Sequence, residues 1–178
     1  VIINTENSTP VANAGPDQTI HVTDTVQLNG SKSSDVDGNP LRFEWSFASK
    51  PAGSIAFFND PSIVNPTFTV DLPGAYVAQL IVNDGTADSS QDSVTITTVN
   101  SAPLANAGPD QTLHVTDAVQ LNGSKSSDVD GNLLTFKWSF TSLPTGSAAA
   151  LSNSTAVNPF FTVDLPGVYV AQLIVSDG

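Results

Sequence analysis

Apolar and polar residues alternate along several short stretches of the chain. The clearest stretch is residues 41–47, "LRFEWSF", in which every second residue is large and apolar. Residues 75–83 and 92–99 follow the same rule. A period of two places alternate side chains on opposite faces of a strand, so each stretch predicts a strand with one buried face. No stretch has helical spacing, and proline or glycine interrupts the chain at short intervals.

The whole pattern occurs twice. Trp45 and Trp138 are separated by 93 positions, as are Tyr76 and Tyr169, and no gap is needed to align the two copies. A period of this length matches a complete small domain and is too long for a solenoid unit. The sequence therefore predicts an all-β protein of two tandem immunoglobulin-like antiparallel β-sandwiches.

The alignment also predicts the domain boundaries. Residues 1–9 resemble the last strand of a preceding repeat followed by a linker, residues 10–100 form the first domain, and residues 101–178 form the second. The second domain contains no counterpart of residues 94–99, so we expect it to lack its last strand within this segment. The segment is expected to be a slice of a longer array.

Several aromatic residues are assigned to the interior. Trp45 and Trp138 fall on the apolar phase of their strands, which favours a place in the core over a sugar-stacking surface. Tyr76 begins a strand directly after "LPG", the position of a tyrosine corner in immunoglobulin-like folds. Phe57 and Phe58 have no aromatic counterpart in the second copy, and we expect loop packing there, with an interface as the alternative.

Composition narrows the range of functions. Seventeen acidic residues against five basic ones give a net charge of −12, which disfavours nucleic acid as a partner. There is no cysteine, and no apolar run is long enough to span a bilayer, so we expect no disulfide and no membrane insertion in this segment. His21 and His114 are expected to be exposed, and no nucleophile motif is present, so no enzymatic activity is expected.

One loop offers two kinds of chemistry. The stretch "NGSKSSDVDGN" occurs at residues 29–39 and again at 122–132. Calcium takes six to eight oxygen ligands, and Asp35 and Asp37 could supply several of them, with Gly38 allowing the tight bend. Alternatively, the same residues form a turn in which serine and aspartate side chains cap backbone amides. The loop is not an EF-hand, because the glutamate required at the twelfth position is absent.

Four motifs in fixed order resemble the PKD domain, an immunoglobulin-like module. They are "ANAGPDQT", "LNGSKSSDVDGN", "FEWSF" and "PGAYVAQLIVNDG", and the second copy repeats them with few changes. The chain departs from many PKD domains after the tryptophan, where "SFASKPAGS" replaces a "DFGDG"-like turn. The resemblance implies a non-catalytic binding or spacer module at the cell surface or in the medium of a bacterium or archaeon.

The resemblance also implies a set of metal ligands. PKD-like domains of clostridial collagenases hold calcium with residues from this loop, from the first strand region and from the strand before the last. Matching those motifs gives one set in each copy: Asn13, Asp35, Asp37 and Asp84, and Asn106, Asp128, Asp130 and Asp177. Three carboxylates gathered at one end of a sandwich would repel each other without a cation, which favours this set.

The sequence is consistent with two functions. The first is a rigid spacer or fibre-forming repeat, adhesive or structural, whose neighbouring copies meet head to tail, by strand complementation if an unpaired edge is exposed. The second is an accessory module of a secreted hydrolase or adhesin that binds collagen, chitin or a glycoprotein. N-x-[ST] triplets are either glycan acceptors or ordinary polar turns, and they begin at Asn7, Asn29, Asn122 and Asn153.

Overall fold

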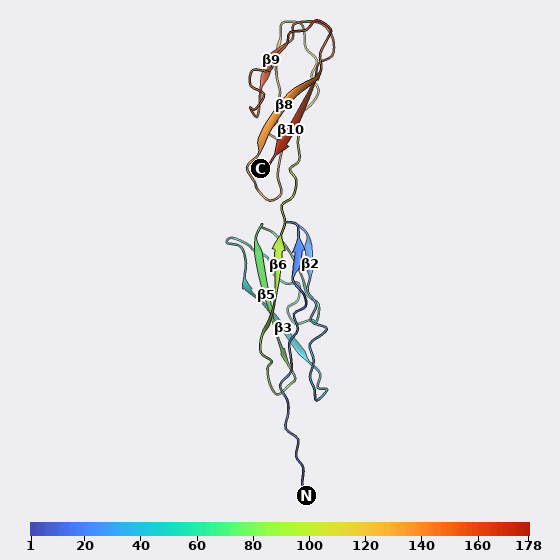
Figure 1. Cartoon of the computed structure of the whole chain (residues 1–178), viewed down its shortest axis with the longest axis vertical. Helices are drawn as coiled ribbons and strands as arrows, with labels where there is room; N and C mark the ends of the chain where they lie inside the picture. Colours follow the sequence, from blue (N-terminus) through green and yellow to red (C-terminus); the bar gives the residue numbers. More distant parts are fainter. The chain divides into compact units, whose positions relative to one another are not determined.

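The chain contains ten strands and no helix, so the all-β prediction is confirmed. The computed structural model describes residues 1–178. They divide into two units, Val1–Asn100 (unit 1) and Ser101–Gly178 (unit 2), which Figure 1 shows in blue to green and in yellow to red. No helix occurs that is long and apolar enough to cross a membrane.

Unit 1 contains a four-stranded and a two-stranded sheet. The larger sheet has the order β1-β6-β5-β3, and Figure 1 shows β3, β5 and β6 side by side. In it Trp45 lies opposite Leu80, and Tyr76 lies opposite Ile96. The smaller sheet pairs β2 with β4. The strands are β1 (Gln18–Ile20), β2 (Thr25–Gln27), β3 (Arg42–Ser49), β4 (Thr67–Thr69), β5 (Ala75–Asn83) and β6 (Asp92–Thr98).

One pairing differs from the expected antiparallel arrangement. β1 runs parallel to β6, with Gln18 opposite Ile96. The two strands lie far apart in the sequence, so no hairpin turn imposes an antiparallel direction on them.

The predicted alternation of buried and exposed residues is confirmed. Along β5 the side chains of Tyr76, Ala78, Leu80 and Val82 are fully buried, and the residues between them are partly exposed. Trp45 is 3% exposed and Trp138 is 2% exposed, so both indoles lie in the core as expected. The opposite wall of the unit 1 core comes from β2, β4 and their flanks, through Val26, Leu28, Phe68 and Val70.

Tyr76 forms the predicted tyrosine corner. Its hydroxyl accepts a hydrogen bond from the N–H of Leu72 at 3.0 Å and lies 2.7 Å from Oδ1 of Asp71. Burial disfavours the charged form of Asp71, but the hydroxyls of Ser54 and Tyr76 outweigh it, so the pKa of Asp71 falls to about 2. Unit 2 repeats the arrangement, with the Tyr169 hydroxyl 2.7 Å from Asp164.

Phe57 and Phe58 lie in different environments, Phe58 packed against other rings and Phe57 exposed. The ring of Phe58 stacks on Phe47 with centroids 4.2 Å apart, and Phe68 meets both rings edge-on. Phe57 is 76% exposed beside Ile55. The packing prediction is therefore confirmed for Phe58 and wrong for Phe57, because the two side chains point to opposite sides of the extended segment.

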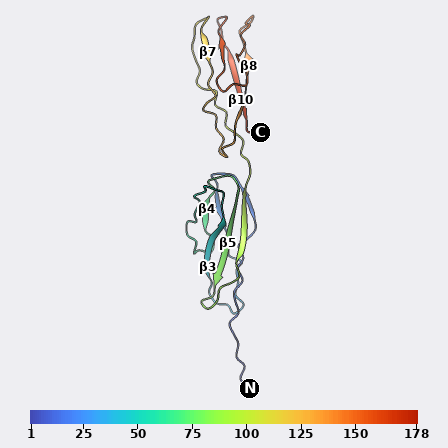
Figure 2. The same cartoon turned by 90° about the vertical axis from the view of Figure 1, so that its left-hand side faces the viewer.

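Unit 2 repeats this plan with fewer strands. It pairs β8 (Thr135–Ser142) with β10 (Val170–Ser176), which lie side by side in Figures 1 and 2, and β7 (Ala118–Gln120) with β9 (Phe160–Thr162). Residues 101–178 contain no counterpart of β6, and β10 has β8 as its one partner. Tyr169, Ala171 and Val175 are in consequence only partly buried, whereas their unit 1 counterparts are fully buried.

Candidate functional site

The repeated acidic loop of unit 1 is an Asx turn. Oδ1 of Asp35 accepts hydrogen bonds from the N–H groups of Asp37 and Asn39, both at 3.0 Å. Gly38 has a φ of 76°, a left-handed conformation in which a side chain would be strained. The loop is thus held by its own first aspartate, which leaves the carboxylate of Asp37 free for other partners.

Those partners come from the segment that precedes the domain. The N–H of Ser8 donates to Oδ2 of Asp37 at 2.6 Å, and Nδ2 of Asn7 donates to Oδ2 of Asp84 at 2.8 Å. The amide of Asn39 in turn donates to Oδ1 of Asn7 at 3.1 Å. We call these five residues the linker clasp, because they fasten residues 7 and 8 to two loops of unit 1.

Asp84 is the most buried member of the clasp, at 7% exposure. Its other oxygen accepts hydrogen bonds from the N–H groups of Thr86 and Ala87 at 2.6 and 2.7 Å. The amide of Asn7 and these backbone donors lower the pKa of Asp84 below its usual value. Asp84 is therefore held in its charged form by neutral donors, with no basic side chain beside it.

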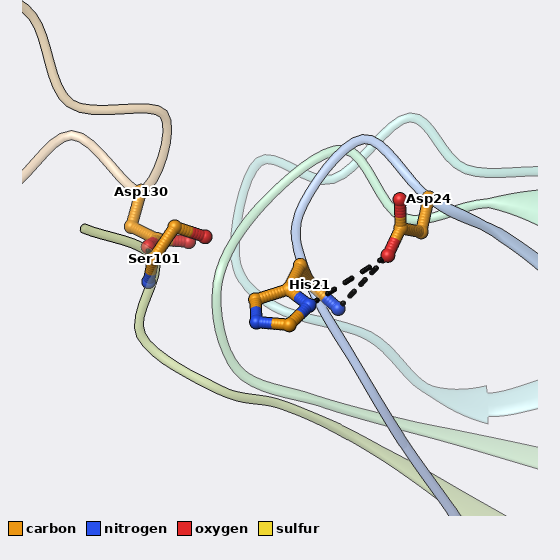
Figure 3. Close-up of polar contacts among 4 residues, drawn as sticks. All are labelled: His21, Asp24, Ser101 and Asp130. Atoms are coloured by element: carbon orange, nitrogen blue, oxygen red, sulfur yellow. Dashed lines mark hydrogen bonds and ion pairs between the residues drawn. The ribbon is translucent and has the colours of Figure 1, made fainter. Parts of the chain in front are cut away.

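Unit 2 has a clasp of the same design. Oδ1 of Asp128 accepts the N–H groups of Asp130 and Asn132, and the N–H of Ser101 donates to Oδ2 of Asp130 at 2.5 Å. Figure 3 shows Ser101 and Asp130 facing each other. Asp130 is 9% exposed. Ser101 and Asp130 occupy the positions of Ser8 and Asp37, 93 residues further along the chain.

Four buried oxygens in the clasps or in the Asx turns beside them lack a hydrogen-bond partner. They are Oδ2 of Asp35, Oδ2 of Asp128, Oδ1 of Asp130 and Oγ of Ser101. Buried polar atoms in folded proteins nearly always have a partner, so carboxylate oxygens of this kind indicate room for a donor or a cation. The His, Cys, Asp and Glu side chains alone do not form a group of three or more that could hold a metal ion.

The structure brings together only some of the calcium ligands predicted from the sequence. Asp37 and Asp84 meet at the linker, and Asp35 holds the same loop. Asn13 makes other contacts: its N–H donates to Oγ of Ser33, and its Oδ1 accepts the N–H of Gly15. Asn106 makes the equivalent contacts with Ser126 and Gly108, and Asp177 is a half-buried residue of unit 2.

Sequence reasoning missed the contribution of the linker. Asn7 and Ser8 were considered only as a linker and a glycosylation triplet, although "NS" recurs at residues 100 and 101. That recurrence, within an otherwise variable linker, is the signal that could have identified them. The two histidines are exposed as predicted, and each lies near an aspartate three residues ahead, His21 3.8 Å from Asp24 (Figure 3).

Comparison with known proteins places these features in a family. The sequence profile of the PKD domain matches residues 7–98 and 100–178. A rat protein, "Dyslexia-associated protein KIAA0319 homolog", is 34% identical over 175 residues, which cover 94% of this chain and 16% of that protein. The "Pre-pro-metalloprotease PrtV" of Vibrio cholerae is 28% identical over 177 residues, 98% of this chain and 17% of that protein.

The chain is also similar to a solved structure. The solution structure of the PKD domain from KIAA 1837 protein is 27% identical and covers 61% of this chain and 100% of that chain, with a TM-score of 0.43. The chain spans about a sixth of the length of the curated relatives it matches. Because the family profile matches both repeats, the chain belongs to the PKD domain family, whose members are non-catalytic modules, and it contains two of them in tandem.

Proposed function

We propose that this chain is an extracellular spacer, a tandem repeat that holds other parts of a larger protein at a distance. One observation carries the proposal: the linker between the two units is a single residue. The N–H of Val99 donates to the carbonyl of Ile20 in unit 1, and the N–H of Ser101 donates to Asp130 in unit 2. Asn100 alone lies between these anchored positions, and it too has a partner.

A one-residue connection suits a spacer because few backbone dihedrals remain free to bend. Small-angle scattering tests this. Insertion of Gly-Ser-Gly-Ser after Asn100 should change the scattering from that of a defined particle to that of two domains moving independently. If the parent chain already scatters as two freely moving domains, the spacer proposal is wrong.

Calcium is the second part of the proposal. Each unit would bind one calcium ion beside its linker. The ligands would be the carboxylates of Asp35, Asp37 and Asp84 in unit 1, and those of Asp128, Asp130 and Asp177 in unit 2. Support comes from the buried carboxylate oxygens without partners in both copies. Carboxylate, amide and carbonyl oxygens are the ligands that calcium prefers. Because Asn13 and Asn106 bond to serine and glycine instead, the proposal relies on the carboxylates.

Thermal unfolding tests the calcium proposal. Sites in extracellular modules bind calcium at about 0.1–1 mM, so 10 mM calcium should raise Tm by about 5–10 °C. Exchange of Asp84 and Asp177 for Asn should remove this response, and 10 mM magnesium serves as the ionic-strength control. An equal Tm in calcium and in EDTA would exclude the metal.

Head-to-tail assembly by strand complementation is the third part. The edge of β10 that corresponds to the β6-facing edge of β5 has no partner strand within residues 101–178. Val1 and Ile3 are exposed, and they match the spacing of Val94 and Ile96, which are fully buried in β6. A strand with this apolar pattern, contributed by a neighbouring repeat, would cover Tyr169 and Ala171, because Ile96 and Val94 lie opposite Tyr76 and Ala78 in unit 1.

A synthetic peptide tests whether unit 2 accepts such a strand. The peptide with the sequence of residues 92–99 should bind the chain and raise its Tm, since apolar surface and a strand edge are covered together. The control peptide has aspartate in place of the valine and isoleucine that match Val94 and Ile96. Equal behaviour of the two peptides would refute complementation.

A recognition function is the second candidate. Ile55 and Phe57 are exposed on unit 1 beside a groove of about 350 Å³ that Phe68 and Thr69 also line. The corresponding residues of the second copy are Ala148 and Ala150. Pull-down on insoluble collagen and chitin tests it: retention that is lost when Phe57 is changed to Ala would favour recognition over the spacer role.

A further inference from the structure

The four N-x-[ST] triplets lie in different surroundings. Asn7, Asn29, Asn122 and Asn153 are all exposed. What distinguishes them is the amide nitrogen Nδ2, which is the atom that an N-linked glycan would occupy. In three of them this nitrogen is free, and in the fourth it is part of the linker clasp.

The other three triplets each form the same type of turn, an Asx turn. Oδ1 of Asn29 accepts the N–H of Ser31 at 3.0 Å. Oδ1 of Asn122 accepts the N–H and hydroxyl of Ser124 at 3.0 and 2.6 Å, and Oδ1 of Asn153 accepts the same two groups of Thr155 at 2.9 Å each. Each Asx turn engages the oxygen through the residue at the third position of the triplet. Nδ2 donates no hydrogen bond in any of the three, so it is directed to solvent by a turn that is already formed.

The backbone behind two of these turns is fixed. The N–H of Gly30 donates to the carbonyl of Val64 at 2.9 Å, and the N–H of Gly123 donates to that of Val157 at 3.0 Å. A Cβ at either glycine would meet that carbonyl oxygen at 2.9 or 2.8 Å. The middle residue of the triplet is therefore packed against the domain while the asparagine side chain stays outside.

The side-chain amide of Asn7 has other partners. Its Nδ2 donates to Asp84 at 2.8 Å and to the carbonyl of Ser8 at 3.1 Å, and its Oδ1 accepts the amide of Asn39. A glycan replaces one of the two hydrogens on this nitrogen, so either the bond to Asp84 or the bond to Ser8 would be lost. The triplet is intact in sequence, but its reactive atom is already in use.

We propose that Asn29, Asn122 and Asn153 are acceptor sites for an N-linked glycan in the folded protein, and that the clasp protects Asn7 from modification. The donor is a lipid-linked oligosaccharide diphosphate, and an oligosaccharyltransferase catalyses the transfer. Nδ2 attacks the anomeric carbon of the sugar, and the bond between that carbon and the diphosphate oxygen breaks. The electron pair of that bond leaves with the lipid-linked diphosphate, the proton that the amide loses passes to solvent, and no oxidation or reduction occurs.

The test uses the folded chain as substrate. Purified protein is incubated with a single-subunit oligosaccharyltransferase and a short lipid-linked oligosaccharide, and the products are analysed by intact mass and peptide mapping. We expect additions at Asn29, Asn122 and Asn153. The initial rate at Asn7 should be lower by about tenfold, which is what two modest hydrogen bonds would confer. Asp84→Ala should raise the rate at Asn7 toward that of the other three.

Matched positions in the chain supply the controls. Asp60 corresponds to Asn153, and its Oδ1 accepts the N–H and hydroxyl of Ser62 at 2.9 and 2.6 Å in the same turn. Asp60→Asn combined with Pro61→Ser should therefore create a fourth acceptor in the chain, the second in unit 1. Asn65 is followed by proline and threonine, so it should stay unmodified.

Two results would overturn the proposal. One is modification of Asn7 in the parent chain at the rate of the other sites. The other is a folded chain that stays unmodified at Asn29, Asn122 and Asn153 while unfolded peptides with the same triplets are glycosylated. The Asn→Gln variants at residues 29, 122 and 153 should have the Tm of the parent chain, because the Nδ2 atoms of these residues donate no hydrogen bond. A loss of glycan in these variants then reports the loss of the acceptor and not a folding defect.

Discussion

At the scale of single residues, the tyrosine corner shows how a neutral hydroxyl fixes a carboxylate. Asp71 accepts hydrogen bonds from Ser54, Tyr76 and the N–H of Ile55, and its pKa is lowered to about 2. The charged form is favoured in the folded state, so this contribution to stability is complete above the ordinary pKa of 3.8. It is lost as the pH falls from about 4 to about 2, because the unfolded chain binds the proton first.

Tyr76→Phe tests this account. The substitution removes the hydroxyl that contacts Asp71 and Leu72, and it should lower the free energy of unfolding by about 1 kcal/mol at neutral pH. The loss of stability between pH 4 and pH 2 should also become smaller, because the folded-state pKa of Asp71 rises. Urea unfolding at several pH values measures both effects, and an unchanged pH profile would contradict the assigned role of the hydroxyl.

Phe57 and Phe58 offer a matched pair of neighbours. Phe58→Ala removes the ring that stacks on Phe47 and should destabilise unit 1 by about 2–3 kcal/mol, somewhat less than a fully buried phenylalanine. Phe57→Ala removes an exposed ring and should change stability by less than about 0.5 kcal/mol. Thermal unfolding of both variants compares the two sites, and equal losses would mean that the packing is assigned wrongly.

At the scale of elements, alternation in the sequence predicted the longest strands of unit 1, which are β3, β5 and β6. The period of two in residues 41–47 and 75–83 assigns the buried face correctly, since Trp45 and Leu80 meet across β3 and β5 in the core. The parallel pairing of β1 with β6 could not be predicted in this way, because alternation carries no information about partner or direction.

The clasp lay beyond the same reasoning for a related physical cause. Asn7 and Asp84 are separated by 77 positions, and only the folded domain brings them together. The acidic loop could be identified as either a turn or a metal ligand from its composition. Its partners are one peptide N–H and one side-chain amide. The recurrence of "NS" marks these two residues, but it does not say which carboxylates they contact.

Within residues 101–178, β10 has one neighbouring strand, which predicts a difference in dynamics between the two copies. β5 is paired on both edges, with β3 and β6, whereas β10 is paired with β8 alone. Amide hydrogens along β10 should therefore exchange faster than those at the matching positions of β5, although seven consecutive residues, Val77–Asn83 and Val170–Ser176, differ only at the last one. Hydrogen–deuterium exchange followed by mass spectrometry compares the peptides, and equal protection would contradict the proposed open edge.

At the scale of the whole molecule, the connection between repeats decides whether the chain can act as a spacer. Val99 is bonded to unit 1 and Ser101 to unit 2, so the chain repeats every 93 residues with a single residue between anchored positions. A net charge of −12 adds repulsion between neighbouring chains, which favours separate, soluble repeats over lateral association. The same connection, if continued along an array, would let length grow with repeat number.

The distance between two spin labels, one on each unit, tests whether the connection between the repeats is stiff. Ser90→Cys and Thr145→Cys place one label on each unit, and the absence of native cysteine makes the labelling specific. Asp130→Ala removes the acceptor of the Ser101 N–H, and Asp110→Ala is the control at an exposed aspartate of unit 2. If the connection is stiff, we expect one narrow distance distribution in the parent chain and in Asp110→Ala, and a broad distribution in Asp130→Ala. A broad distribution in the parent chain, or no change in Asp130→Ala, would contradict a stiff connection.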